Sequence, residues 1–106
     1  MIKCTFRKRG EYFVEFEIFG HANYDEKGKD IVCAAVSTVS QHTARALKKE
    51  GAIVQVVDTG KLKVERIADS EVSQRFVVEL METLIDLSEQ YPKYIRVNVE
   101  VNDDAH

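Results

Sequence analysis

The first part of the chain alternates between apolar and polar side chains. This period of two covers residues 2–8 and 12–19, on either side of a turn at 9–11. It predicts the two strands of a β-hairpin, because successive side chains of a strand point to opposite faces. The side chains expected to face the core are Ile2, Cys4, Phe6, Tyr12, Val14, Phe16 and Ile18.

The outer faces of these two strands carry opposite charges. One strand offers Lys3 and Arg7, and the other offers Glu15 and Glu17. Opposite charges on facing strands stabilise a hairpin, so we expect cross-strand ion pairs. Phe13 and Phe19 also fall on this outer face, either as isolated surface side chains or as part of a dimer patch.

Two later segments have the period of a helix. Apolar residues recur every three or four positions from residue 31 to 50, and again after 69–71 up to Tyr91. Asp30 is placed to cap the first helix and Gly51 to follow its end. Pro92 stops the second helix. The expected buried stripes are Val32, Ala35, Val36, Val39, Ala46 and Leu47, then Val72, Phe76, Val77, Leu80, Met81, Leu84 and Leu87.

Three further strands complete the pattern. Residues 52–58 and 61–67 predict a second hairpin around 58–60, and residues 94–101 predict a last strand before a frayed polar tail at 102–106. The side chains expected to be buried are Val54, Val56, Leu62, Val64, Ile95, Val97, Val99 and Val101.

The predicted order of elements is therefore ββαββαβ. Because most strands have one charged face, only one side of the sheet is expected to be covered. The prediction is an α+β fold: a two-layer sandwich with two helices on one face of a largely antiparallel five-stranded sheet. The pattern does not determine the order of the strands.

Length and composition narrow the class of protein. The 106 residues suit one domain, 1–106, and 44% hydrophobic with 31% charged residues is typical of a folded globular chain. A net charge of −3 argues against a nucleic-acid binder. No apolar run resembles a signal peptide or a membrane span, so we expect a cytoplasmic protein that contacts no membrane.

The two cysteines differ in their local pattern. Cys4 alternates with core residues of the first strand and is expected to be inert. Cys33 is the third residue of the first helix, where free backbone N–H groups and the helix dipole favour a thiolate and an adjacent oxyanion. The alternative for Cys33 is a small buried side chain that fills space beside two alanines.

A long polar loop, residues 20–30, leads from the second strand to this helix. Loops of this length in a compact domain are often functional. His21 lies at one end of the loop and Cys33 just beyond the other, so the two side chains can approach each other. A cysteine and a histidine are the minimum set for acyl transfer by a thiolate. The alternative is a histidine that only contacts water.

Several residues could support this pair. Asp30 can cap the helix and can also orient His21, a role that Asp25 or Glu26 could fill instead. Ser37, one helical turn beyond Cys33, can donate a hydrogen bond near the site or bond back to its own helix. A zinc site built from His21, Cys33 and an acidic residue has no recognised spacing, so we expect no metal and no cofactor. His42 and His106 are assigned no role.

Two segments carry a resemblance to a known family. The letters GHA at 20–22 and GKDIVCAAVS at 28–37 resemble the signature of the ribosomal-processing cysteine protease family, called Prp. The length of the chain and the order of its elements agree with that family over nearly the whole sequence. The resemblance places the catalytic pair on His21 and Cys33, with Gly20, Asp30 and Ser37 in supporting roles.

The resemblance also implies a biological setting. Members of the family are bacterial, cytosolic homodimers. They remove a short N-terminal extension from the large-subunit ribosomal protein numbered twenty-seven, and they cleave after an aromatic residue. The expected partner of this chain is therefore a ribosomal protein precursor, bound as a peptide substrate.

The resulting hypothesis is a Cys-His endopeptidase whose loop 20–30 opens for an extended peptide and closes over it. Its rival is a non-enzymatic module that binds a ribosomal protein or an assembly intermediate, and that forms complexes without product. A third reading, a thiol redox protein, predicts a sulfenic acid or mixed disulfide at Cys33. The rate at which iodoacetamide alkylates Cys33, measured against pH, distinguishes the three.

Overall fold

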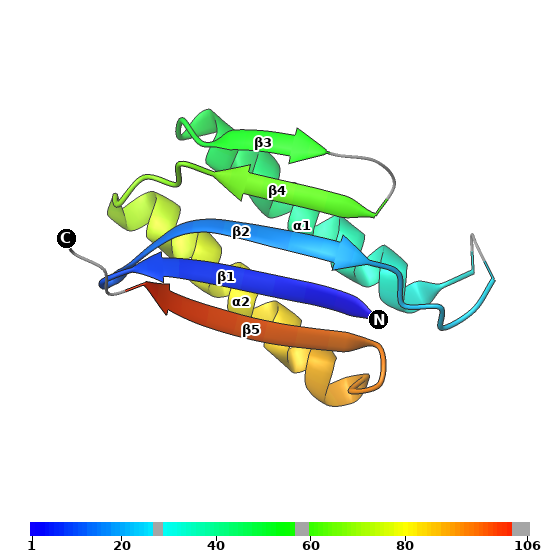
Figure 1. Cartoon of the computed structure of the whole chain (residues 1–106). Helices are drawn as coiled ribbons and strands as arrows, with labels where there is room; N and C mark the ends of the chain where they lie inside the picture. The colour runs from blue at the N-terminus through cyan, green and yellow to red at the C-terminus, as the bar shows by residue number, and fades with distance from the viewer. Residues whose placement is uncertain (27–28, 57–59, 103–106) are drawn as a thin grey trace.

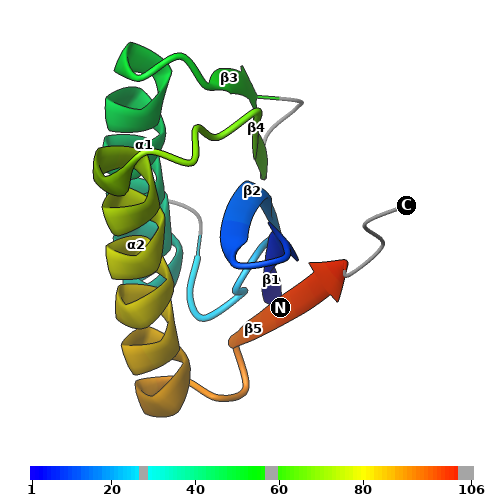
Figure 2. The same ribbon diagram turned by 90° about the vertical axis from the view of Figure 1, so that its left-hand side faces the viewer.

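Five strands form one sheet, and both helices pack on the same face of it (Figure 1). The computed structural model describes residues 1–26, 29–56 and 60–102. In the side view of Figure 2 the helices and the sheet form two separate layers. The predicted two-layer α+β fold and its order of elements are confirmed. The elements are β1 (Ile2–Arg9), β2 (Tyr12–Gly20), α1 (Ile31–Lys49), β3 (Ile53–Val56), β4 (Lys61–Glu65), α2 (Glu71–Gln90) and β5 (Ile95–Asn102).

Some predictions lie outside the described residues. These are the turn at 58–59, the end of the predicted strand 52–58, the tail at 103–106 and the Gly28 position of the motif.

The strands lie in the order β3-β4-β2-β1-β5. β5 runs parallel to β1, while the other three pairings are antiparallel, so the sheet is mixed and largely antiparallel. In this order β2 is the middle strand, with β4 on one side and β1 on the other. The loop after β2 leads into α1, and Figure 1 shows the end of β2 and the start of α1 at the same end of the molecule.

The core lies between the sheet and the helices. Phe6, Phe16, Leu47, Leu80 and Leu84 are fully buried there. The rings of Phe6 and Phe16 stack with their centroids 5.4 Å apart. Burial of each such side chain contributes about 1.5–3 kcal/mol, so these few residues fix the helix layer on the sheet.

Both helices begin at a capping side chain, and the predicted cap Asp30 is confirmed for α1. Asp30 accepts from the first turn of α1, and the Ser70 hydroxyl accepts from the N–H of Ser73 in α2. Gly51 follows the end of α1 with φ of 97°, in the left-handed region that favours glycine. No helix within the described part of the chain is long and apolar enough to cross a membrane.

The prediction of which side chains of β2 face the core is wrong at the start of the strand. A register shift between Arg7 and Lys8 pairs Arg7 with Glu15 but Lys8 with Phe13, which leaves Val14 as an extra residue. This β-bulge turns Phe13 into the core, where its exposed fraction is 6%, and leaves Tyr12 46% exposed. The ring of Phe13 then meets Phe6 edge to face.

Burial was also overestimated at the two edge strands. Val56 of β3 is 74% exposed, and Val99 and Val101 of β5 are 45% and 56% exposed. α2 crosses the sheet obliquely (Figure 1), and along β5 the exposed fraction rises from 2% at Ile95 to 56% at Val101. Val72, expected in the buried stripe of α2, is exposed in its first turn. Edge positions can therefore keep the alternating pattern without a layer to cover them.

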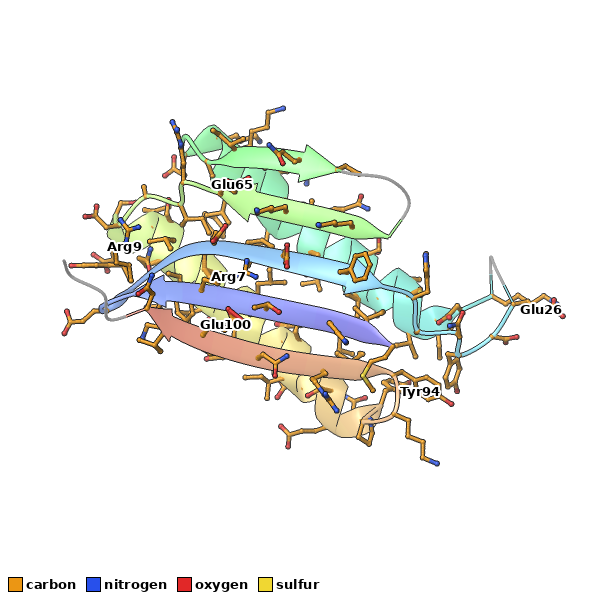
Figure 3. All side chains as sticks on the ribbon, viewed as in Figure 1. Arg7, Arg9, Glu26, Glu65, Tyr94 and Glu100 are labelled. Atoms are coloured by element: carbon orange, nitrogen blue, oxygen red, sulfur yellow. The ribbon has the colours of Figure 1, made fainter. Side chains whose placement is uncertain are left out.

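The uncovered face of the sheet carries the predicted ion pairs. Arg7 lies 3.3 Å from Glu17 and 3.8 Å from Glu15, and it also pairs with Glu100 of β5 at 3.2 Å. Figure 3 shows Arg7 and Glu100 on this open face. Such half-exposed pairs contribute little each, about 0–1 kcal/mol, but they link three neighbouring strands.

Candidate active site

Asp30 organises the start of α1. Its Oδ1 accepts hydrogen bonds from the N–H groups of Val32 at 3.0 Å and Cys33 at 2.9 Å. Its Oδ2 accepts from the N–H of Tyr24 at 3.0 Å. One carboxylate therefore caps the helix and holds the preceding loop to it. No contact joins Asp30 to His21 among the described residues, so the structure places Asp30 as a cap.

The charge state of Asp30 follows from these contacts. Partial burial alone would raise its pKa, but hydrogen bonds from the N–H groups of Cys33 and Tyr24, and from the Cys33 thiol, outweigh that effect. The pKa of Asp30 is therefore held below its ordinary value, and the carboxylate is ionised at neutral pH.

This cap corrects one expectation about the helix start. The N–H groups of Val32 and Cys33 were expected to be free for an oxyanion, but both donate to Asp30. The donor directed at the sulfur is instead the N–H of Ala22, which lies 3.3 Å from Cys33 Sγ. Ala22 follows His21 in the loop and is buried.

His21 lies at the end of β2 with an exposed side chain. Its imidazole packs on Gly60, where an added Cβ would lie 2.8 Å from Nε2 and 2.9 Å from Cε1. Its backbone carbonyl accepts from the Met1 amino group at 2.6 Å. No hydrogen bond joins the imidazole to Cys33 within the described residues. Catalytic hydrogen bonds often form fully only when substrate is bound. The lack of this hydrogen bond in the free protein is therefore compatible with a catalytic Cys-His dyad.

Gly20 fixes the direction in which the chain leaves β2. Its φ of 108° lies in the left-handed region, and an added Cβ would meet the backbone carbonyl of Met1. Its N–H donates to the carbonyl of Gly60 at 2.8 Å. Glycine is therefore required here, and it brings the β2 end against Gly60, the residue that precedes β4.

Cys33, His21 and Ser37 line one cavity of about 260 Å³ between α1 and the sheet. The cavity extends along α1 from Cys33 to Gln41, which is about 12 Å at 1.5 Å per residue. Its apolar walls come from both layers, and Lys61 lies at its side. The apolar lining residues are Ile2, Ile18, Val36, Val56 and Leu62.

Ser37 and Cys4 differ from Cys33 in their exposure and their hydrogen bonds. Ser37 is exposed, and its hydroxyl accepts from the Gln41 side chain at 2.8 Å. Cys4 is fully buried, and burial raises the pKa of its thiol to about 12. Cys33 is only partly buried. The thiol that meets the cavity is therefore Cys33.

Sequence reasoning missed three features of the site: Ala22, Gly60 and the apolar cavity walls. Only Ala22 had a local signal, since it belongs to the GHA segment. The structure also groups no three His, Cys, Asp or Glu side chains in a metal-binding arrangement within the part it describes.

A sequence model of the family described as cysteine protease Prp matches residues 1–96. The chain belongs to this family. A 40-residue segment is 45% identical to the ribosomal processing cysteine protease Prp of Bacillus subtilis (strain 168), and it covers 37% of this chain and 36% of that protein. The aligned segment thus spans about a third of the relative's length.

Solved structures agree with the Prp fold. The chain is 28% identical to SMU.848 from Streptococcus mutans, with a TM-score of 0.78 and 96% of each chain covered. The ribosomal processing protease Prp from S. aureus in complex with a substrate peptide gives 23% identity and a TM-score of 0.81, over 94% of this chain and all of that one. The same protease with a covalently linked product peptide gives a TM-score of 0.87.

Proposed function

We propose that this Prp-family chain is a cysteine endopeptidase in which Cys33 is the nucleophile and His21 moves the proton. The observation that carries the proposal is their common cavity: a partly buried thiol at a helix start, with a backbone N–H directed at its sulfur, shares one apolar cavity with an exposed imidazole. A thiolate and a nearby base are the elements that acyl transfer requires.

The proposed reaction has two stages. The Cys33 thiolate attacks the peptide carbonyl, and the tetrahedral oxyanion forms beside the Ala22 N–H, the donor that already points at the sulfur. His21 protonates the departing amine, and the acyl group stays on sulfur as a thioester. His21 then takes a proton from water, which attacks the thioester and releases the acid.

The position of His21 beside a glycine is compatible with this role. Its side chain is exposed and packs on a glycine, so no neighbouring Cβ restricts the ring on that side. A peptide in the cavity would exclude water around the ring and the sulfur. Lower local polarity strengthens the interaction between imidazolium and thiolate.

The proposed substrate is the large-subunit ribosomal protein numbered twenty-seven, from which a short N-terminal extension is removed after an aromatic residue. The cavity supports this choice because its walls are apolar and it starts at Cys33. A side chain that precedes the cleaved bond can enter the cavity while its carbonyl lies at the sulfur. The net charge of −3 gives weak steering toward a basic ribosomal protein.

We further propose a cytoplasmic homodimer of a single domain, 1–106. A shallow apolar hollow on the outer side of α1 supports self-association, since Ile31 is 56% exposed there beside Ala34 and Val39. Sedimentation velocity at micromolar concentration tests it, and a purely monomeric species contradicts it.

The cleavage test compares two peptides that carry the extension and differ only by phenylalanine or alanine before the scissile bond. The wild type should release the expected fragments from the first peptide and little from the second, as seen by mass spectrometry. Cys33→Ala and His21→Ala should release none, while Lys49→Ala, an exposed residue at the end of α1 outside both the cavity and the hollow, should behave as wild type. A stable complex without fragments would support the binding-module alternative.

A further inference from the structure

Three tyrosines gather where the loop after β2 meets the end of α2. We call Tyr24, Tyr91 and Tyr94 the aromatic clamp. The ring of Tyr24 meets Tyr91 at 5.7 Å between centroids and Tyr94 at 5.2 Å, with interplanar angles of 81° and 82°. Edge-to-face pairs are favourable because the positive ring edge meets the negative ring face. Figure 3 labels Tyr94 just before β5, at the same end of the sheet as this loop.

Tyr24 is also held through its backbone. Its N–H donates to Asp30 Oδ2 at 3.0 Å, and the other oxygen of the same carboxylate caps α1. The ring of Tyr24 is therefore fixed to α2 and to the start of β5, while its main chain is fixed to the start of α1.

Only Ala22 and Asn23 separate Tyr24 from His21. Asn23 has φ of 56°, so the chain turns sharply in the left-handed region between them. The position of Ala22 consequently depends on where Tyr24 is held. The N–H of Ala22 lies 3.3 Å from Cys33 Sγ.

The clamp and the cavity are built from different residues. The cavity is lined by α1, by the end of β2, by β3 and β4 and by Ile2 of β1, whereas the clamp rings come from the loop after β2, the end of α2 and the residue before β5. No described residue of segment 22–26 lines the cavity. The clamp thus holds the loop against the sulfur without filling the space that a substrate would use.

We propose that Tyr24 is a positioning residue, which acts through Ala22 to hold a backbone N–H against Cys33 Sγ. The inference rests on the proposed function in one respect, that Cys33 is the nucleophile. An N–H directed at sulfur favours the thiolate over the thiol, and the same N–H lies beside the forming oxyanion.

Other charged groups face the sulfur and do not depend on the clamp ring. These are Asp30 at the helix start, and His21 and Lys61 in the cavity. A Tyr24→Ala variant keeps all three and removes only the ring contacts. A change in thiol reactivity in this variant therefore reports the position of the Ala22 N–H.

The test measures the rate of iodoacetamide alkylation of the full chain from pH 5 to 10, with Cys33→Ser as the blank. Tyr24→Ala should slow alkylation roughly three- to tenfold at neutral pH, because the N–H that favours the thiolate is less well held. Tyr24→Phe keeps the ring and should superimpose on wild type. Tyr12→Ala, an exposed tyrosine at the start of β2, is the matched control.

Thermal melting checks that each variant is folded, and Tyr24→Leu takes the place of Tyr24→Ala if the latter unfolds. An unchanged alkylation rate in a folded variant without the ring overturns the proposal, as does an equal fall in rate in Tyr24→Phe. In peptide cleavage, Tyr24→Ala should lower kcat at constant KM, and a rise in KM alone contradicts positioning. Cleavage by Cys33→Ala would overturn the proposed function instead, while alkylation still decides the role of Tyr24.

Discussion

Replacement of Asp30 by alanine tests how the site is assembled. The substitution removes an acceptor from three backbone N–H groups at once, those of Tyr24, Val32 and Cys33. Two of these bonds cap α1, and the third holds the loop. The variant should therefore weaken the helix start and release the segment that carries Ala22.

The expected cost follows from these three bonds. Loss of an N-cap side chain costs about 0.5–2 kcal/mol, typically about 1. The bond to Tyr24 is exposed, so its loss adds about 0.5 kcal/mol. The total loss in the free energy of unfolding is about 1.5 kcal/mol, which corresponds to a fall in Tm of roughly 6–12 °C for a domain of this size.

The effect should depend on pH in a defined direction. The pKa of Asp30 is lower in the folded protein than its ordinary value, so its stabilisation is fully present above the unfolded pKa of about 3.9. That stabilisation is lost as pH falls through the folded pKa. The difference in Tm between wild type and Asp30→Ala should accordingly be constant near pH 7 and shrink below about pH 4.

Two matched variants separate the roles of the carboxylate. Asp30→Ser keeps a capping oxygen but cannot reach Tyr24, so its Tm should lie between those of wild type and Asp30→Ala. If Asp30 only caps and positions, Asp30→Ser should also retain most of the peptide cleavage. Calorimetry and the cleavage assay on the same samples give both results.

Three outcomes would refute this reasoning. The first is a Tm for Asp30→Ala within about 2 °C of wild type, which would mean that the cap is not a stabilising contact. The second is an equal loss in Asp30→Ser and Asp30→Ala. The third is a folded, stable Asp30→Ser variant without activity, which would assign Asp30 a direct role on His21.

Three further substitutions have defined outcomes. Gly60→Ala places a Cβ 2.8 Å from His21 Nε2, so kcat should fall about tenfold or more, and unchanged kcat contradicts the placement of the ring. Gly20→Ala introduces a Cβ at φ of 108° and against the Met1 carbonyl. It should lower the free energy of unfolding, measured in urea, by about 1–3 kcal/mol, and an unchanged free energy would show that the backbone there is not constrained. Ser73→Ala removes a buried hydroxyl that has no hydrogen-bond partner among the described residues, so the free energy of unfolding should rise by about 1 kcal/mol, and a fall would reveal a partner.

Local signals were sufficient for the elements and for the start of α1. Capping depends on a side chain and the N–H groups two and three residues later, so Asp30 and Cys33 could be placed from the sequence. The alternation over β1 likewise predicted its buried face and the ion pairs of Arg7. These features need no knowledge of which strands are neighbours.

Features that depend on distant residues were not predictable in this way. The bulge at Val14 has no local signature, so the burial of Phe13 was missed. The contact of His21 with Gly60 requires that β4 lie beside β2, and the alternating pattern carries no information on strand order. One error was of reasoning: Asp30 was predicted as the cap, yet the N–H groups of Val32 and Cys33, which such a cap uses, were also predicted to be free.

The most direct test of the account is to find the atom that carries the acyl group. The protein is mixed with an ester analogue of the aromatic peptide, quenched in acid within seconds, digested and analysed by mass spectrometry. The account predicts an acyl adduct on the peptide containing Cys33, absent from Cys33→Ala and from the buried Cys4. Turnover with no adduct at Cys33, and undiminished in Cys33→Ala, would contradict it.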